Sequence, residues 1–526
     1  MAAINRNYFL KIIYAMLFTV CFGCIMCVDS YAEMPVYDLR ESGMVTSVKN
    51  RGEDNTCYAF AIIAAIENNL IRQGFEDNTV DLSEEQLVWF FYNRQNDLLN
   101  LTNGDRNVLT DGDVLSSGGN IKLASVHMMT GAGVASEQDI PYGITPSPEQ
   151  CYNSIYQVEN VFFYDCTQEN IKNCIREHGA AAVAMYMDES CLSENGGYYT
   201  DCTSANHSVT LVGWNDGYSR ENFHENLRPE TDGAWIAKES RGENYADSGY
   251  FYISYEDKSI SDVCAFQMRS KDKMYDNIYQ YDGTACPDKK LIKNGSKISN
   301  IFKSVAVNGK CEALKAISIN TQSENVKYSI QVYVGLSDGN NPESGRKVFG
   351  TEQTGVLKTA GYQTIELKKY ILLNPGEKYS IVITLSGDSK VYIGKDVYYD
   401  AGWIIFNSVS AKGQSFIKKS DGAWKDYGDS GNFRIKAYTD NLDFTNKYKI
   451  SKKSLKLKVG KTKKLAVIAP SKAAKRIVKW SVADKKIATV SANGKVKGKR
   501  AGKTRVIAEM ICGSKNKKYV CDVLIK

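Results

Sequence analysis

Cys57 is the side chain of this sequence with the greatest potential for covalent chemistry. It lies in the stretch NRGEDNTCYAF, residues 50–60, between a glycine-bearing turn and the apolar run AFAIIAAIENNLI. The run has helical spacing, so Cys57 is predicted at the start of a helix. A thiol attacks a carbonyl carbon only as thiolate, and a helix N-terminus lowers its pKa below the usual value of about 8.5. Cys57 is therefore predicted to be a nucleophile; a small buried side chain or half of a disulfide are the alternatives.

A cysteine nucleophile needs an imidazole that holds the thiolate and later protonates the leaving amine. His207 lies in SANHSVTLVGWND, where it opens a predicted strand ahead of Gly213, which suits a side chain directed into a cleft. The three other histidines are His127, His178 and His224. We therefore pair Cys57 with His207; for His207 the alternative is a hydrogen-bonded histidine of the core.

The segments around these two residues predict an α+β domain with two subdomains. CYAFAIIAAIENNLIRQG has apolar residues at helical spacing and ends at Gly74, and DLSEEQLVWFFYNRQ opens with Ser83 as a helix N-cap. AAAVAMYM, HSVTLVGWND, GAWIAKES and GYFYISYED are short β-rich runs bounded by Gly and Asp. Helices thus come first and strands later in the region from about residue 35 to 266.

Two all-β regions follow. From about residue 275 to 438 helical periodicity is nearly absent, and strands such as YSIQVYVG and KYSIVITLS recur between turns such as SDGNN and NPGEK, which predicts a β-sandwich. Residues 447–526 alternate apolar and basic side chains, which predicts a second, smaller sandwich. The predicted fold class is therefore multidomain, with an α+β domain followed by two all-β sandwich domains.

The N-terminus predicts export. Basic residues precede an apolar run over residues 12–28, and the small-residue pattern SYA follows at residues 30–32. This order is typical of a secretory signal peptide, here residues 1–32; a retained membrane anchor is the alternative. No later segment approaches the roughly 20 apolar residues that span a bilayer, so we expect no membrane span after cleavage.

The formal net charge of +6 hides a strong asymmetry. Residues 447–526 carry 25 Lys and Arg against 3 Asp and Glu, whereas the rest of the chain carries 41 basic and 57 acidic residues. A basic domain can bind nucleic acid or an anionic polymer at a cell surface. Because the chain is predicted to be exported, we expect no nucleic-acid partner and an anionic cell-wall polymer instead; a merely solvated basic face is the alternative.

Fourteen cysteines are present, and three of them lie within the predicted signal peptide. The eleven that remain are an odd number, which fits one free reactive thiol, Cys57, and ten cysteines that pair in an oxidising compartment. Close spacing favours three disulfides: Cys191 with Cys202, Cys286 with Cys311, and Cys512 with Cys521.

YDLRESGMVTSVKNRGEDNTCYAFAIIAAIE, residues 37–67, resembles the start of the mature papain-like cysteine peptidases. Further matches follow in the same order: LSEEQLV, SSGGN, NGGYYTDCTSANHSVTLVGWN and WIAKESRGENYADSGYFYIS. The resemblance covers about 230 residues and implies a papain-like peptidase domain at residues 33–268, acting on proteins or peptides without metal or organic cofactor. It implies Cys57 as the nucleophile and His207 as its general base and acid.

The resemblance also implies the substrate-binding residues. SSGGN resembles the family's Gly-Gly substrate-binding stretch, so Gly118 and Gly119 are expected to bind substrate. Ala184 and Asn206 should lie near the pocket for the second residue before the scissile bond, where the small Ala leaves an apolar pocket open to bulky side chains.

Three positions depart from the family pattern. The Gln of the family's oxyanion hole corresponds to Arg51, which can still donate hydrogen bonds and stabilise a developing oxyanion by its charge. The Asn that orients the histidine corresponds to Glu239, whose carboxylate can accept the imidazole N–H and favour imidazolium. The shielding Trp corresponds to Arg241, which predicts that the His–Glu contact is exposed to water. Alternatively, Arg51 and Glu239 pair with each other across the cleft and disable turnover.

Two further departures concern the domain as a whole. Asp54 and Ser116 stand where the family has two cysteines that form a disulfide. The catalytic region begins almost directly after the predicted signal peptide, so we expect the long inhibitory propeptide of the family to be missing.

The later regions resemble two kinds of β-domain. Residues 269–442 resemble the lectin-like sandwich that follows papain-like domains in secreted clostridial proteins, and four aromatic residues there can stack on sugar rings or else pack in the core: Tyr398, Tyr399, Trp403 and Trp424. Residues 447–526 resemble a bacterial immunoglobulin-like group 2 domain, with Trp480 in its core and a hairpin at its Ala-Asn-Gly turn. Such domains usually serve as spacers or adhesion modules.

These observations favour a secreted cysteine endopeptidase with a Cys-His dyad, held at the surface or wall of a Gram-positive bacterium. One alternative is a catalytically impaired protein that binds protein or glycan ligands through its cleft and β-domains. Another is a transpeptidase or amidase that uses the same dyad on wall peptides.

Overall fold

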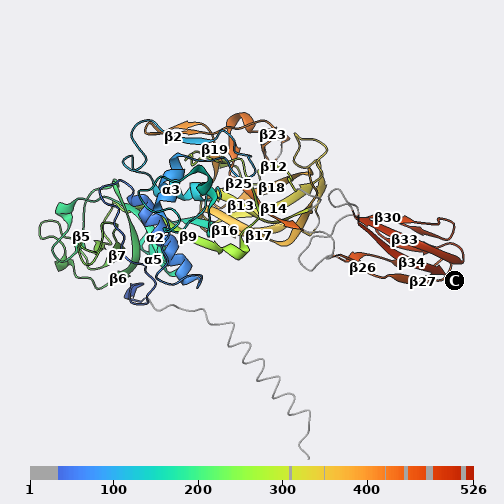
Figure 1. The fold of residues 1–526 in the computed structure, drawn as a ribbon, viewed down its shortest axis with the longest axis horizontal. Helices are drawn as coiled ribbons and strands as arrows, with labels where there is room; N and C mark the ends of the chain where they lie inside the picture. Colours follow the sequence, from blue (N-terminus) through green and yellow to red (C-terminus); the bar gives the residue numbers. More distant parts are fainter. Residues whose placement is uncertain are drawn as a thin grey trace, which may run out of the picture.

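A computed structural model describes residues 34–306, 311–348, 350–420, 422–442, 448–468, 478–510 and 517–526. The predicted signal peptide, residues 1–32, lies outside the described residues. The described chain forms three modules in a row, with a helix-containing module at one end, a sandwich in the middle and a smaller sandwich at the C-terminal end (Figure 1). This arrangement confirms the predicted fold class. In the described residues, no helix combines the length and apolarity that crossing a bilayer requires.

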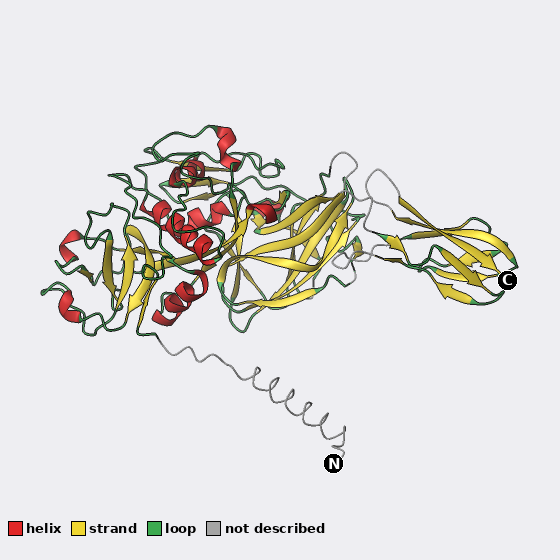
Figure 2. Ribbon diagram, turned by 60° about the horizontal axis from the view of Figure 1, so that its bottom comes forward, coloured by secondary structure: helices red, strands yellow, loops and turns green. Residues whose placement is uncertain are grey.

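The α-helices of the described chain lie in the first module; Figure 2 draws them in red together with the short 3-10 helices. They are α2 (Cys57–Arg72), α3 (Glu84–Tyr92), α4 (Ile121–Met128) and α5 (Gln168–His178). Helix α2 ends before Gly74, whose φ of +69° is the left-handed conformation that stops a helix. The hydroxyl of Ser83 accepts the backbone N–H of Gln86 at 3.0 Å and caps α3. Both helix predictions are therefore confirmed.

Most strands of the first module form an antiparallel sheet in the order β3-β9-β4-β6-β7-β8, with β5 at its edge and β1 paired to β6, whereas β2 belongs to another sheet. The strands are β1 (Val36–Asp38), β2 (Arg106–Leu109), β3 (Tyr156–Phe163), β4 (Ala181–Met185), β5 (Gly197–Tyr198), β6 (His207–Asn215), β7 (Ala234–Lys238), β8 (Tyr250–Ser254) and β9 (Ser261–Ser270). One apolar core lies among α2, α3, α4, β3 and β9, and a second among β4, β6, β7, β8 and α5. These two cores confirm the two predicted subdomains.

Helix α2 runs between the two subdomains and packs directly on β6. The Thr210 hydroxyl donates a hydrogen bond to the carbonyl of Ala61 at 3.1 Å, which fixes strand against helix. Cys57 is the first residue of α2 and His207 is the first residue of β6. The fold thus brings the beginnings of these two elements together, at the line where the subdomains meet.

The middle module is a sandwich, as predicted. Its strands are β10 (Asn277–Tyr279), β11 (Lys289–Ile292), β12 (Lys297–Lys303), β13 (Cys311–Thr321), β14 (Val326–Val334), β15 (Arg346–Lys347), β16 (Gln353–Leu357), β17 (Ala360–Leu373), β18 (Lys378–Ser386), β19 (Val391–Asp396), β20 (Tyr399–Asp400), β21 (Ile404–Asn407), β22 (Ser415–Lys418), β23 (Trp424–Asp426), β24 (Asn432–Phe433) and β25 (Ile435–Leu442). One sheet contains β10-β25-β13-β17 and the other β15-β14-β18-β12-β22-β23, and a large aliphatic core fills the space between them.

Strands of the first module pair with strands of the middle module, a feature that the sequence did not predict. β17 pairs with β3, with Ala360 opposite Phe163 and Tyr362 opposite Val161, so one sheet runs through both modules. In addition, β2 of the first module pairs with β21 of the middle one. The boundaries at residues 268/269 and 442/447 stay predictions.

The third module encloses its own core between a four-stranded sheet, β27-β34-β33-β30, and a three-stranded sheet, β28-β32-β31. Its strands are β26 (Lys449–Ile450), β27 (Ser454–Leu457), β28 (Thr462–Lys464), β29 (Val467–Ile468), β30 (Lys479–Val482), β31 (Ala488–Val490), β32 (Lys495–Gly498), β33 (Gly502–Met510) and β34 (Lys517–Ile525). Trp480 packs against the core, and the turn before Gly494 joins β31 to β32 as a hairpin. The hairpin prediction is confirmed, whereas Trp480 is partly buried and packs against the core rather than within it.

The three predicted disulfides are wrong. Cys191, Cys202, Cys286 and Cys521 are free thiols, and Cys512 lies outside the described residues. Cys311 is disulfide-bonded, but not to Cys286. Cys286 is buried at the junction with the first module, whereas Cys311 is buried where the middle module meets the third. For Cys286 and Cys311, proximity in sequence was a poor guide, because neighbouring segments of a sandwich run to opposite ends of it.

Candidate active site

A cleft of about 490 Å³ opens at the beginnings of α2 and β6. Seven of the eight predicted site residues line it: Arg51, Cys57, Gly118, Gly119, Ala184, Asn206 and His207. The eighth, Glu239, lies directly behind His207 at the end of β7. Five segments of the sequence therefore meet at one place.

Cys57 opens α2, where backbone N–H groups have no partner within the helix. The carbonyl of Thr56, one residue earlier, accepts the N–H groups of Ala59 and Phe60 and starts the helical turn. Burial alone would raise the pKa of the Cys57 thiol. The hydrogen bond with His207, the charge of His207 and the charge of Arg51 outweigh burial, so the pKa is lowered.

His207 is held between Cys57 and Glu239. Its Nε2 lies 2.8 Å from Oε2 and 3.0 Å from Oε1 of Glu239, which leaves the other ring nitrogen, Nδ1, available to Cys57. Burial disfavours the imidazolium, but the hydrogen bonds to Cys57 and Glu239 and their charges raise the pKa of His207 to about 9. Burial works against the Glu239 carboxylate too, yet His207 and the Ser240 N–H at 2.8 Å lower its pKa. His207 and Glu239 are therefore a charged pair at neutral pH.

Arg51 and Glu239 do not pair, so that alternative is wrong. Nη1 of Arg51 donates to the carbonyl of Gly52 at 3.4 Å and to the carbonyl of Asp54. The Glu239 side chain is 0% exposed, and its oxygens are occupied by His207 and Ser240. The guanidinium therefore stays on its own loop and leaves Glu239 to the histidine.

The predicted exposure of the His–Glu contact to water is also wrong. The His207 side chain is only 6% exposed, and Glu239 is fully buried. Arg241, in the position of the family's Trp, forms an ion pair with Glu189 and lies 5.0 Å from the centre of the Tyr245 ring. The Tyr245 hydroxyl donates to Glu189 at 3.1 Å. Arg241, Glu189 and Tyr245 form one cluster at the position of the family's Trp, called the cover below. An ion pair on an aromatic ring thus takes the place of one large aromatic side chain.

The Gly-Gly stretch needs glycine for steric reasons. A Cβ on Gly119 would lie 2.3 Å from the ring of Tyr58, the residue after the nucleophile. Gly118 has a φ of +73°, and its carbonyl accepts the Tyr92 hydroxyl. Asn55 holds the stretch to the N-terminus of α2, because its N–H donates to the carbonyl of Leu115 at 2.8 Å and its Nδ2 to that of Ser116 at 2.7 Å. These bonds join the segments where the family has a disulfide.

The pocket beside Ala184 is more polar than expected. Asn206 also lines it, and its amide is tied to the backbone N–H and carbonyl of Met187 at 2.7 and 3.1 Å. Asp262 lines the pocket as well, paired with Lys122 at 3.0 Å and with Asn120 at 2.8 Å. A bulge in β9 with a φ of +51° at Asp262 turns this carboxylate into the cleft, and no sequence pattern indicated the bulge.

A family model described as "Papain family cysteine protease" matches residues 34–274. The chain is 30% identical over 223 residues to zingipain-2 of Zingiber officinale, an alignment that covers 40% of this chain and 84% of that protein. The chain belongs to the papain family of cysteine proteases. It is also 26% identical over 258 residues to a viral cathepsin of Heliothis zea nuclear polyhedrosis virus, covering 47% of this chain but 60% of that relative.

The β-modules match family models too. A "Lectin like domain" model matches residues 278–439, and a "Bacterial Ig-like domain (group 2)" model matches residues 444–519. The solved structure of the clostridial cysteine protease Cwp84 after propeptide cleavage is 25% identical, with a TM-score of 0.67, and covers 77% of this chain and 99% of that one. A second structure contains the cysteine protease and lectin-like domains of Cwp84, "a surface layer associated protein of Clostridium difficile"; it is also 25% identical, with a TM-score of 0.66, and covers 78% of this chain and 89% of that one. The order of the first two modules in this papain-family protein thus has a solved counterpart.

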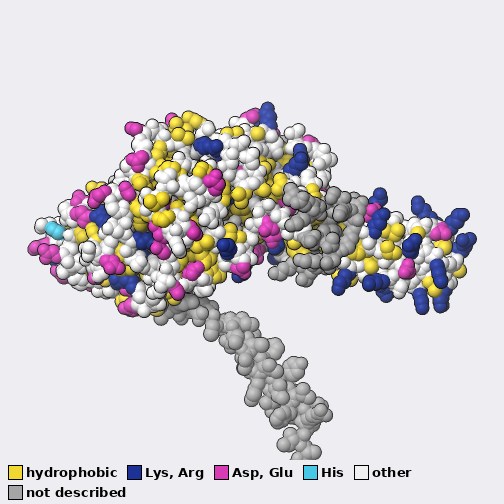
Figure 3. All heavy atoms as spheres, viewed as in Figure 1, with side chains coloured by type: hydrophobic (Ala, Val, Ile, Leu, Met, Phe, Trp, Pro, Cys, Tyr) yellow, Lys and Arg dark blue, Asp and Glu magenta, His cyan; other side chains and the backbone are white. Residues whose placement is uncertain are grey.

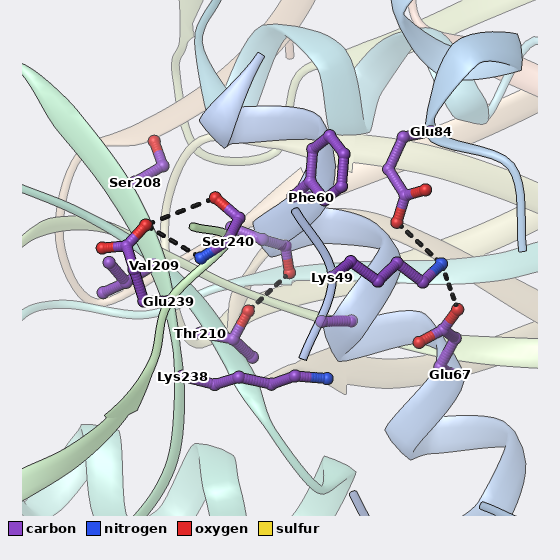
Figure 4. Close-up of a pocket in the computed structure, with 12 residues that line it drawn as sticks. Lys49, Phe60, Glu67, Glu84, Ser208, Val209, Thr210, Lys238, Glu239 and Ser240 are labelled. Atoms are coloured by element: carbon purple, nitrogen blue, oxygen red, sulfur yellow. Dashed lines mark hydrogen bonds and ion pairs between the residues drawn. The ribbon is translucent and has the colours of Figure 1, made fainter. Parts of the chain in front are cut away.

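A buried network of ion pairs and hydrogen bonds lies next to Glu239 of the papain-family site. Figure 4 shows Lys49 between the carboxylates of Glu67 and Glu84, at 2.9 Å from each. Glu67 also accepts the Thr46 hydroxyl at 2.6 Å, and Lys238 donates to the carbonyl of Thr46 at 2.9 Å. Lys238 directly precedes Glu239, and Lys49 lies two residues before Arg51. The network therefore joins α2, α3 and β7 beneath the cleft, and sequence reasoning missed it.

The three other histidines lie elsewhere. His127 is buried with both ring nitrogens unpartnered, and burial lowers its pKa to about 3. His178 stacks on Phe162 and bonds the Tyr164 hydroxyl, and His224 is in a surface loop. Only His207, among the four, reaches Cys57. In the described residues, no group of three or more His, Cys, Asp and Glu side chains is arranged to hold a metal ion.

Three of the four aromatic residues considered for sugar stacking are exposed. Tyr398 is 57% exposed, Tyr399 40% and Trp403 38%, and they lie in and around the β20–β21 hairpin. Trp424 is different, because its Nε1 donates to Glu343 at 3.0 Å and Lys418 lies over its ring. Trp424 therefore serves to pack its own sheet.

Proposed function

We propose that this chain is a secreted, surface-associated cysteine endopeptidase that hydrolyses peptide bonds through Cys57 and His207. Membership of the papain family supports a peptidase. One observation carries the proposal: His207 bonds Glu239 through Nε2 and interacts with Cys57, which raises the pKa of His207 to about 9 and lowers that of Cys57. A thiolate facing an imidazolium is the active form of a cysteine nucleophile.

Each group in the cleft has a step in this reaction. The Cys57 thiolate attacks the carbonyl carbon of the scissile bond, and the oxygen gains charge beside the Cys57 N–H and the Arg51 guanidinium. His207 gives its proton to the leaving amine and then takes one from the water that hydrolyses the thioester. Glu239 keeps the ring oriented and favours its charged form, as a carboxylate does in serine triads. Gly118, Gly119, Ala184 and Asn206 hold the acyl side of the substrate.

The geometry favours this function over an impaired site. Impairment was expected from an Arg51–Glu239 pair or from a His–Glu contact open to water, and neither is present. Arg241 belongs to the cover over the histidine rather than to a block across the cleft.

Covalent labelling with a peptidyl-epoxide probe tests the proposal. The test uses the chain from residue 33 to residue 526. We expect the probe to label the native protein at Cys57, and to label neither Cys57→Ala nor His207→Ala. Cys174→Ala is the matched control, because Cys174 is fully buried and the pKa of its thiol is raised. If the native protein is not labelled while Glu239→Asn is, the natural cleft is switched off and a ligand-binding role replaces the peptidase. Products formed in the presence of an amine acceptor separate hydrolysis from transpeptidation.

We further propose that the third module holds the enzyme on an anionic wall polymer of a Gram-positive surface. Exposed cations cover both of its sheets: Lys456, Lys463, Lys464, Lys479, Lys495, Lys497, Lys503 and Arg505. Figure 3 shows this module dotted with dark blue, whereas acidic and basic side chains are mixed on the first module. Exposed charges bind through counterion-sensitive attraction, so sedimentation with purified walls should fall with salt and after chemical removal of the anionic polymer. Sedimentation that ignores both treatments would contradict it. The exposed aromatics Tyr398, Tyr399 and Trp403 are the proposed glycan contacts of the lectin-like module.

A further inference from the structure

Arg51 is a cation in the cleft that pairs with no carboxylate of the described residues. Its Nη1 donates only to main-chain carbonyls, its Nε is buried without a partner, and its Nη2 has none among the described residues. Other arginines of the first module pair with acidic side chains: Arg40, Arg228, Arg241 and Arg269. Nη2 of the Arg51 guanidinium is therefore left to donate to a substrate carboxylate, and the positive charge strengthens that hydrogen bond.

The backbone fixes Arg51 on one side of the catalytic pair. Its N–H donates to the carbonyl of Ser240 at 2.9 Å, and the preceding residue, Asn50, forms a β-bridge with Arg241. Ser240 and Arg241 directly follow Glu239, the residue behind His207. Because His207 delivers its proton to the leaving amine, the residues beyond it receive the part of the substrate that leaves. Arg51 and Arg241 therefore lie on the leaving-group side.

We infer that this side of the cleft selects a carboxylate in the first or second residue after the scissile bond. The carboxylate belongs either to an Asp or Glu side chain or to the free C-terminus of a short substrate. The inference deepens the proposed function and depends on it for the direction in which a substrate lies. The inference does not extend to the acyl side of the cleft. There the cation Lys122 is already paired with Asp262.

The charges nearby make Arg51 the determinant. Arg241 is neutralised by Glu189 on the outer edge, with side-chain exposures of 30% and 56%. Glu239 is occupied by His207 and cannot repel a substrate carboxylate from Arg51 at close range. Asp54, three residues after Arg51, turns its own carboxylate to the Tyr142 hydroxyl at 2.9 Å. One uncompensated positive charge thus faces the leaving group.

Internally quenched peptides that differ only by Asp or Asn at one position provide the test. We expect kcat/KM for Asp to exceed that for Asn by about tenfold at the first or second position after the bond, the size of one charge-assisted hydrogen bond. At the two positions before the bond the ratio should be near one. A parallel pair of peptides, with a C-terminal acid or amide two residues after the bond, distinguishes a side-chain carboxylate from a free terminus.

Variants assign the effect to a side chain. Arg51→Gln removes the charge while restoring the family's oxyanion donor, so the Asp to Asn ratio should fall to near one; Arg51→Lys should keep most of it. Glu189→Gln frees Arg241 and should raise the ratio. Lys293→Gln makes the same change of charge at an exposed lysine of the middle module and should leave the ratio as it is. A ratio near one at every position of the native protein, or one that Arg51→Gln does not change, would overturn the inference.

Binding to Cys57→Ala keeps this test separate from turnover. The Asp and Asn peptides are titrated against this variant, with and without Arg51→Gln, and the affinity ratio is read directly. If the epoxide probe fails but the affinity ratio still depends on Arg51, the proposed peptidase is wrong and the carboxylate site stands. If the probe labels Cys57 but neither ratio depends on Arg51, the peptidase stands and the carboxylate site is wrong.

Discussion

The first and third modules carry their charges in opposite ways. In the first, the charges that matter are buried and contact groups of opposite charge: Lys49 lies between Glu67 and Glu84, and His207 is held by Glu239. In the third, most of the lysines and arginines lie at the surface, and few have an acidic neighbour, since residues 447–526 contain only 3 Asp and Glu. Counting basic and acidic residues along the sequence therefore identifies the third module, but it does not reveal the buried ion pairs of the first. The chemistry of the chain depends on the few charges that the count hides.

The buried network should be the most sensitive part of the comparison. Lys49→Met leaves Glu67 and Glu84 buried without their cation, and breaking a buried ion pair in this way costs about 3–5 kcal/mol. Urea unfolding followed by the fluorescence of the buried Trp214 and Trp235 measures the loss. The matched control is Lys327→Met, whose pair with Asp388 is 53% and 86% exposed and contributes roughly 0–1 kcal/mol. Equal losses in the two variants would contradict the distinction between buried and exposed pairs.

Glu239→Gln should change the pH dependence of the enzyme more than its fold. The thiolate–imidazolium pair exists above the lowered pKa of Cys57 and below the pKa of His207, about 9. Activity should therefore disappear on the acid side as Cys57 gains a proton, and on the alkaline side as His207 loses its proton near pH 9. Gln can still accept the imidazole N–H but carries no charge, so the pKa of His207 should move toward its usual value of about 6.5 and bring the alkaline limb down with it.

The pH profile of kcat/KM, or of epoxide labelling, measures that shift. Glu177→Gln serves as the control, since Glu177 is an exposed carboxylate beside a different histidine, His178. An alkaline limb that stays near pH 9 in Glu239→Gln would mean that Cys57 alone maintains the charge of His207.

The cover over the histidine should give a smaller effect. Arg241→Ala removes the ion pair with Glu189 and the cation over Tyr245, which lets water reach the His207–Glu239 contact. We expect labelling of Cys57 to slow by roughly threefold to tenfold, because a hydrogen bond in contact with water is weaker. Arg241→Trp, the residue that the family has here, should restore the rate. A slower rate in Arg241→Trp than in Arg241→Ala would show that the ion pair has a role beyond shielding.

The sequence indicated the residues of the site better than their partners. Cys57 and His207 follow from a helix start and a strand start, and such local signals survive folding. Three other features depend on side chains brought together from distant segments: the Glu189 cover of Arg241, the Lys49 network and the Asp262 carboxylate. The pairing of β3 with β17 could not be predicted for the same reason: each strand, taken alone, has the pattern of an edge strand in a separate domain. The disulfide predicted between Cys286 and Cys311 failed because closeness in sequence was taken for closeness in space, whereas Cys191 and Cys202 lie near each other as free thiols.

Neutralising the third module should have the smallest effect on stability and a clear one on binding. Each of Lys456→Gln, Lys497→Gln and Lys503→Gln removes an exposed charge that pairs with no acidic side chain of the described residues, so the free energy of unfolding should change by less than about 0.5 kcal/mol per substitution. The triple variant should also bind purified walls more weakly and with a shallower dependence on salt, while the rate of Cys57 labelling stays as in the native protein. The exposed face would then be separable from the cleft. If the triple variant unfolds as readily as Lys49→Met, the surface charges take part in folding, and the contrast between the two modules fails.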